Sequence, residues 1–396
     1  MPAAAARQQS AAAMPPIQIV VGVGTPEAVF LEAEVDCMSI RDRVHAFCDR
    51  FGLRIPILLG PMAGACPPSL SIAVANAGGM GACGALMMEP DEIFGWATAV
   101  RASTPGPFQL NIWIPDPPPL RNREHERRVR AFLAQWGPEV PDAAGDAPLK
   151  DFAAQCEALL EAKPAAISSV MGLYPDLFVA RMKERAVPWF ATVSSLDEAV
   201  RAEAAGADVI VVQGMEAGGH RAAFDPNGAE LRLVGLVSLV PAVADSVRVP
   251  VVAAGGIADG RGVAAALSLG ASAVQIGTGF LRCPEAQIHP AWADAIARTA
   301  PEQTIVTRAF SGRPGRSIGT AYVRAAMSDD APVPAPYPVQ RGLTASMRLA
   351  ANKAGDIDRM QAWAGQSARL AQPQPATALA RRIWEDAQGL MHWTAG

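Results

Sequence analysis

Short apolar runs that end in glycine alternate with longer helical segments along most of the chain, and this alternation constrains the fold more than any other feature. Such runs are typical of buried parallel strands, whose two faces both contact helices. We predict eight strands, at Ile55–Met62, Gly79–Leu86, Phe108–Ile114, Ala165–Gly172, Pro188–Ser195, Asp208–Gly214, Pro250–Ile257 and Ala273–Leu281. Eight strand–helix repeats predict an α/β fold of the (β/α)8 TIM-barrel type.

A doubly wound open sheet is the alternative fold for such an alternation. That fold usually carries GxGxxG directly after its first strand, where a dinucleotide binds. Here the first predicted strand ends in GPMAGACP, which lacks the pattern. We therefore favour the barrel.

The predicted strands leave long segments on both sides of the barrel. We predict an N-terminal tail and lead-in over 1–44, the barrel over 45–283, a smaller, mostly helical lid domain over 284–355, and C-terminal helices over 356–396 that pack back on the barrel. Helical patterns near 343–370 and 375–391 predict the helices of the last part.

Glycines close the last two predicted strands, which end Ala-Ala-Gly-Gly-Ile at 253–257 and Gln-Ile-Gly-Thr-Gly at 275–279. The loops after strands 7 and 8 are the usual phosphate site of a TIM barrel. Glycine lets backbone N–H groups approach phosphate oxygens, and Thr278 can add a hydroxyl donor. The pattern predicts a phosphorylated ligand, and the alternative is that Gly255 and Gly256 only form a tight turn.

The end of the sixth predicted strand carries a histidine in the segment QGMEAGGH, residues 213–220. An imidazole at a barrel rim can exchange protons near neutral pH, so His220 is a candidate general acid or base. It could instead be a packed or surface histidine, and a metal site with Glu216 lacks a third ligand. In the third predicted strand, Asn111 could hydrogen-bond a heterocycle or cap a loop.

Several absences narrow the chemistry. Only four of the 34 basic residues are lysines, and none ends a predicted strand, which disfavours Schiff-base and pyridoxal-phosphate enzymes. The chain has no P-loop and no G-x-S-x-G elbow. Its net charge of −4 argues against a nucleic-acid or membrane partner held by bulk charge. Six scattered cysteines indicate reduced thiols and a cytoplasmic location.

At these residues the sequence resembles the nitronate monooxygenase family, formerly called 2-nitropropane dioxygenases, and its class I branch in particular. The resemblance runs from about Phe47 to the C-terminus. It is carried by IPILLGPMAGA, ANAGGMGACG, GADVIVVQGMEAGGHR, VPVVAAGGIADGRGVAAALSLGASAVQIGTGFL, FSGRPGR and MQAWAGQSA.

The resemblance implies an FMN enzyme that oxidises alkyl nitronates with O2, and it leaves neutral nitroalkanes open as further substrates. The products are a carbonyl compound and nitrite, after one-electron transfer to the flavin. The resemblance assigns catalysis to His220 and no metal. It assigns FMN contacts to Pro61, Met62, Ala63, Asn111, Gln213, Gly218, Gly219, Gly255, Gly256, Gln275, Gly277 and Thr278. The implied partners are a small-molecule substrate and O2, and the oligomeric state stays open, a homodimer included.

Small departures from the family pattern, at Gly60, Ala222 and Gly279, leave the substrate open. Arg313 and Arg316 could reach substrate or phosphate, or form surface salt bridges. The alternative function is an FMN-dependent NAD(P)H oxidoreductase that reduces quinones or enoyl thioesters. A flavin-binding protein without catalysis is a further alternative. An enzyme like IMP dehydrogenase would need a cysteine in the loop 215–234, which has none.

Overall fold

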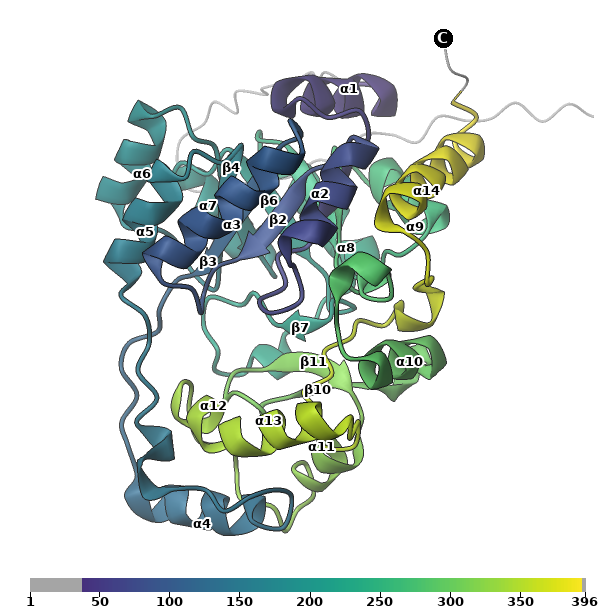
Figure 1. Cartoon of the computed structure of the whole chain (residues 1–396). Helices are drawn as coiled ribbons and strands as arrows, with labels where there is room; N and C mark the ends of the chain where they lie inside the picture. Colours follow the sequence, from purple (N-terminus) through teal and green to yellow (C-terminus); the bar gives the residue numbers. More distant parts are fainter. Residues whose placement is uncertain (1–37, 394–396) are drawn as a thin grey trace, which may run out of the picture. The chain divides into compact units, whose positions relative to one another are not determined.

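Eight parallel strands form the barrel, as the sequence predicts, and each lies inside a predicted run (Figure 1). The computed structural model describes residues 38–393, so most of the predicted tail over 1–44 lies outside the described residues. The barrel strands are β1 (Ile57–Leu59), β2 (Gly81–Gly84), β3 (Phe108–Trp113), β4 (Ala166–Val170), β5 (Trp189–Val193), β6 (Val209–Gln213), β8 (Val251–Ala254) and β9 (Ala273–Ile276).

The strands are hydrogen-bonded in the order β1-β9-β8-β6-β5-β4-β3-β2. A parallel bridge between Leu58 and Met80 joins the two ends of this order and closes the barrel. Because all strands run parallel, their carboxyl ends meet at one rim, where enzymes of this fold build their sites.

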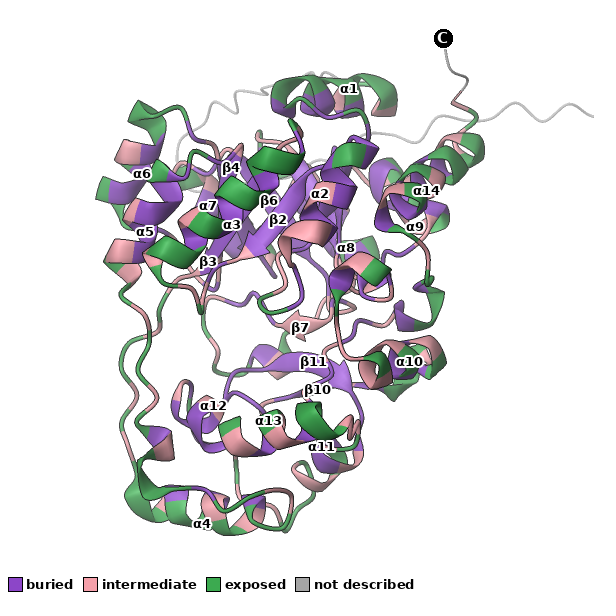
Figure 2. Ribbon diagram, in the orientation of Figure 1, coloured by how far each residue is buried: buried purple, intermediate pink, exposed green. Residues whose placement is uncertain are grey.

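The strands are buried on both faces, and the surrounding helices are exposed on their outer faces only (Figure 2). The helices around the barrel are α2 (Pro68–Ala77), α3 (Pro90–Ser103), α5 (Phe152–Glu161), α6 (Asp176–Glu184), α7 (Leu196–Ala204), α8 (Leu236–Ala244), α9 (Gly260–Ser268) and α14 (Ala376–Leu390). The last helix, α14, packs against both α9 and α2 and so completes the ring. No helix within residues 38–393 is both long and apolar enough to cross a membrane.

Local signals explain where several helices begin. The Oγ atom of Ser195 accepts a hydrogen bond from the backbone N–H of Glu198 and caps α7. The carboxylate of Asp259 accepts from two backbone N–H groups and caps α9 in the same way. Before β1, helix α1 (Ile40–Phe51) packs its Phe51 ring 5.0 Å from the ring of Phe190, measured between centroids.

A second, smaller cluster of buried side chains lies beyond the carboxyl rim. A three-stranded antiparallel sheet, in the order β10 (Thr304–Thr307), β11 (Gly315–Ile318) and β7 (Gly219–His220), lies between the barrel and this cluster (Figure 1). The cluster includes residues of α4 (Arg123–Leu133), α11 (Ala321–Ala325), α12 (Val339–Leu343) and α13 (Ala345–Ala354). Helix α4 comes from the β3–β4 connection, although it lies inside the range 45–283 predicted for the barrel. Helix α10 (Pro290–Arg298) packs beside a third small cluster.

The single helical stretch predicted over 343–370 is wrong. Helix α13 ends at Ala354 because Gly355 adopts a left-handed φ of 66°, and the α-helix does not continue. The chain then runs in irregular structure past Trp363, which forms an isolated bridge with Ser317. This irregular segment carries side chains to the carboxyl rim of the barrel.

Candidate active site

A cavity of about 460 Å³ lies at the carboxyl rim, within the size range of small-molecule sites. All thirteen residues that the sequence assigns to the site line this one cavity. They are Pro61, Met62, Ala63, Asn111, Gln213, Gly218, Gly219, His220, Gly255, Gly256, Gln275, Gly277 and Thr278. These residues lie in or directly after five barrel strands, β1, β3, β6, β8 and β9, and barrel closure brings them together at one rim.

Gly255 and Gly256 follow β8 in a conformation that other residues rarely adopt. Their φ angles are 116° and 67°. A Cβ atom on Gly255 would lie 2.9 Å from the backbone nitrogen of Ala217, and one on Gly256 would lie 3.0 Å from the Cβ of Glu216. Only glycine therefore fits both positions without a shift of the neighbouring loop.

Backbone donors in this part of the cavity wall are free to bind a ligand. The N–H groups of Gly255, Gly256, Gly277 and Thr278 have no acceptor within residues 38–393. The hydroxyl oxygen of Thr278 accepts a hydrogen bond from the Gly365 N–H at 3.0 Å, which leaves the hydroxyl proton free to donate. We call residues 255, 256, 277 and 278 the glycine cradle. Such a set of uncharged donors suits a phosphate group.

Three amide side chains of the predicted set differ in how many of their hydrogen-bonding groups the protein already uses. Gln213 uses both ends within the protein, because its Nε2 donates to the carbonyl of His220 at 3.0 Å and its Oε1 accepts from the N–H of Ala222 at 2.9 Å. Asn111 donates to the Ser168 hydroxyl at 3.0 Å, and Gln275 accepts from Gln109 at 3.0 Å. Gln213 therefore positions the histidine loop, whereas Asn111 and Gln275 each keep an end for a ligand.

His220 lies on the short strand β7, where it pairs with Gly315 of β11. Its Nε2 atom is 2.8 Å from the Oγ of Ser311. The Ser311 hydroxyl itself donates to the carbonyl oxygen of Arg313 at 3.2 Å, so the hydrogen between His220 and Ser311 belongs to Nε2. This network assigns the lone pair to Nδ1, which is then the proton-accepting atom of the ring.

Two indole rings enclose the imidazole. The ring centroids of Trp113 and Trp363 lie 4.6 Å and 4.7 Å from that of His220. This burial, followed by the positive charges of Arg313, Arg341 and Arg348, lowers the pKa of His220 to about 3. The imidazole is therefore neutral at physiological pH.

Three buried arginines brace the loop that leads to His220. Arg221 donates to the Gly214 carbonyl at 2.7 Å, Arg316 to the Met215 carbonyl at 2.8 Å, and Arg313 to the Ala223 carbonyl at 3.2 Å. Arg313 and Arg316 do not line the cavity, so the expectation that they could reach a ligand is not met. Arg313 also lies 3.4 Å from the carboxylate of Asp116.

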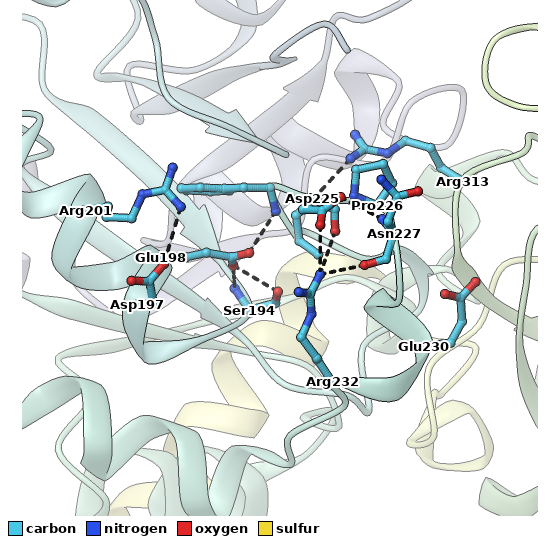
Figure 3. Close-up of polar contacts among 12 residues, drawn as sticks. Ser194, Asp197, Glu198, Arg201, Asp225, Pro226, Asn227, Glu230, Arg232 and Arg313 are labelled. Carbon is cyan, nitrogen blue, oxygen red and sulfur yellow. Dashed lines mark hydrogen bonds and ion pairs between the residues drawn. The ribbon is translucent and has the colours of Figure 1, made fainter. Parts of the chain in front are cut away.

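The outer part of the β6–β8 connection is tied down as well (Figure 3). The Glu198 carboxylate accepts from the backbone N–H groups of Ser194 at 2.7 Å and Phe224 at 2.8 Å. Arg232 donates to the backbone carbonyls of Asp225 and Asn227 at 3.1 and 2.8 Å. These contacts hold residues 224–232 of the connection in place.

Glu216, weighed as a metal ligand with His220, has another role. Its carboxylate accepts from the backbone N–H of Leu236 at 3.0 Å, at the start of α8. A carboxylate at the N-terminus of a helix is favoured by the helix dipole, and it supports the wall beneath Gly256.

One side of the cavity consists of residues that the sequence analysis did not assign to the site. Ser311, Arg341, Arg348, Gln361 and Trp363 all line it, and they come from the segment after the barrel strands. Only the motifs FSGRPGR and MQAWAGQSA pointed to this region, because they contain Ser311, Gln361 and Trp363. No local signal marks Arg341 or Arg348, since both lie on ordinary helical stretches.

Comparison with known proteins agrees with this geometry. The family model named Nitronate monooxygenase matches residues 45–386. The nitronate monooxygenase of Paraburkholderia phytofirmans is 37% identical over 345 residues, which cover 86% of this chain and 94% of that protein. The nitroalkane oxidase of Streptomyces ansochromogenes has a solved structure that is 33% identical, with a TM-score of 0.81, and covers 88% of this chain and 99% of its own. FabK of Thermotoga maritima is 30% identical with a TM-score of 0.67, over 88% and 97% of the two chains.

The barrel, the cavity at its carboxyl rim and these similarities define a TIM-barrel oxidoreductase. More particularly, the chain belongs to the nitronate monooxygenase family.

Proposed function

We propose that this protein binds FMN and oxidises alkyl nitronates with O2 to a carbonyl compound and nitrite. The observation that carries the proposal is the glycine cradle in the same cavity as His220. The cradle offers the free donors that a phosphate needs, and a Cβ atom at Gly255 would collide with the loop behind it. The bound flavin would accept one electron from the substrate and pass it to O2.

The residues around the cavity fit FMN in three ways. The cradle would hold the phosphate, and Asn111 and Gln275 have amide groups left for the edge of a heterocycle. The backbone of Pro61 to Ala63, after β1, would lie along the ring system. The two indoles keep water away from His220 and so strengthen electrostatic interactions there.

The chain's own contribution to the reaction depends on the substrate. A nitronate is already deprotonated at carbon, so His220 does not have to accept a proton from it. With this substrate the role of His220 is to orient the anion. A neutral nitroalkane must first lose its α-proton, and Nδ1 of His220, the ring nitrogen that Ser311 does not engage, would take it. A base with so low a pKa is weak, which favours nitronates over nitroalkanes as substrates.

The direct test is product analysis with ethylnitronate. Purified protein is expected to release nitrite and consume O2, and nitrite release should stop when O2 is removed. Protein that holds FMN but forms no nitrite from any alkyl nitronate would disprove the proposed activity.

A pH profile provides a second test. For nitroethane, kcat/KM is expected to stay flat between about pH 5 and pH 8, because the lowered pKa of His220 keeps its base form populated throughout. The value of kcat/KM should fall only as the pH approaches the His220 pKa of about 3. A half-maximal rate near pH 6.5 would show that the imidazole has an ordinary pKa.

A further inference from the structure

The charged side chains that line the cavity are all of one sign. Among its described lining residues, the charged side chains are Arg341 and Arg348, and none is a carboxylate. This is unusual in a chain with a net charge of −4. A concave, positively charged site concentrates anions and disfavours cations.

Arg348 is fixed in place by neutral partners. Its Nε donates to the Thr344 hydroxyl at 3.1 Å, and its two terminal nitrogens donate to Gln361 Oε1 at 3.0 Å and to the carbonyl of Arg341 at 2.9 Å. None of these partners neutralises its charge. Burial, together with the nearby charge of Arg341, lowers the pKa of Arg348 to about 10, so it stays charged at neutral pH.

Arg341 lies on α12, the helix before α13, which carries Arg348, and its guanidinium group is less constrained. Within residues 38–393 it forms neither an ion pair nor a hydrogen bond, although its backbone carbonyl accepts from Arg348. Its charge is close enough to act on both His220 and Tyr337. The guanidinium carries five N–H donors in a plane, which match the two oxygens of a nitro or carboxylate group.

We propose that Arg341, supported by Arg348, is the group that binds the negative charge of the substrate beside His220. This inference rests on the proposed function, and it gives the two arginines and His220 different roles at the site. Arg341 and Arg348 supply the positive charge for a nitronate, and the neutral imidazole is left to accept a proton from a nitroalkane.

The substrate anion is a better partner for Arg341 than the phosphate of FMN. The glycine cradle lies on loops after β8 and β9, and its donors are enough for a phosphate without an arginine. Arg341 comes from α12, lines the same cavity as His220 and lies within electrostatic range of its imidazole.

The test compares Arg341→Met, Arg341→Lys and the control Arg298→Met in the purified holoenzyme. Arg298 is exposed at the end of α10 and does not line the cavity, so its replacement removes the same charge elsewhere. For each variant we would measure kcat and KM for ethylnitronate and nitroethane, the dissociation constant of nitrite by calorimetry, and the FMN content. Nitrite serves as a small anion that binds without turnover.

Arg341→Met is expected to raise the KM for ethylnitronate and the dissociation constant of nitrite on the order of 10- to 100-fold, as for the loss of hydrogen bonds to a charged group. The KM for neutral nitroethane and the FMN content should change little. Arg341→Lys should recover part of the loss, and Arg298→Met should behave like the unmodified enzyme.

Two results would overturn the inference. One is unchanged nitrite and ethylnitronate binding in Arg341→Met, and the other is loss of FMN, which would place Arg341 at the phosphate. If the unmodified enzyme does not turn over ethylnitronate at all, the proposed function fails, and the nitrite titration then decides the anion site alone.

Discussion

Replacing Gly255 with valine is expected to weaken FMN binding on the order of 100-fold or more. Gly255 has a φ of 116°, a conformation that a β-branched residue almost never adopts, and its Cβ would lie 2.9 Å from the Ala217 nitrogen. Relief of this collision must move the loop and with it the backbone donors of residues 255 and 256. Two lost charge-assisted hydrogen bonds, at roughly 1.5 kcal/mol or more each, give the predicted change.

The measurement is the dissociation constant of FMN, followed by flavin fluorescence, with circular dichroism to show that the variant folds. Gly95→Val is the matched control, since Gly95 lies in α3 and a Cβ there has no neighbour within 4 Å. If Gly255→Val fails to fold, Thr278→Val removes one cradle donor and should weaken FMN about 10-fold. Full FMN binding in a folded Gly255→Val protein would contradict the assignment of the cradle.

Replacing His220 with asparagine is expected to lower kcat for nitroethane on the order of 10²- to 10⁴-fold, the usual contribution of a general base. Asparagine can still hydrogen-bond to Ser311 but cannot accept the α-proton at neutral pH. Turnover of ethylnitronate should fall much less, because that substrate has no α-proton to lose before oxidation. Steady-state kinetics with both substrates on one protein preparation measure this difference.

Ser311→Ala is the companion variant, since it removes the hydroxyl that fixes the imidazole tautomer and leaves the imidazole in place. Its effect on nitroethane should be smaller than that of His220→Asn. Equal losses for nitroethane and ethylnitronate in His220→Asn would show that His220 acts on both substrates alike and is not primarily a base.

The barrel could be predicted from the sequence because short segments of neighbouring residues determine each of its strands and helices. Each buried parallel strand is a short apolar run, and the helices begin at residues such as Ser195 and Asp259 that cap them within three positions. The strand order of a (β/α)8 barrel then follows from the chain order. This places Gly255 and Thr278 side by side although 22 residues separate them.

The other side of the cavity could not be predicted because it depends on contacts between distant segments. His220 pairs with β11 through a strand of only two residues, too short to give a periodic pattern. In the sequence, Gly355 resembles a single glycine that a helix can accommodate. In the structure it ends α13, and the segment that follows brings Trp363 into contact with His220. Arg341 has no distinguishing neighbours in the sequence, and only the fold shows that no carboxylate of the described residues pairs with it.

Anaerobic mixing, followed by flavin absorbance, tests the central claim most directly. The purified protein should lose its oxidised-flavin absorbance rapidly with ethylnitronate and change little with NADH or NADPH. Rapid bleaching by NADH or NADPH, with no response to ethylnitronate, would contradict the proposed function and establish the NAD(P)H oxidoreductase instead.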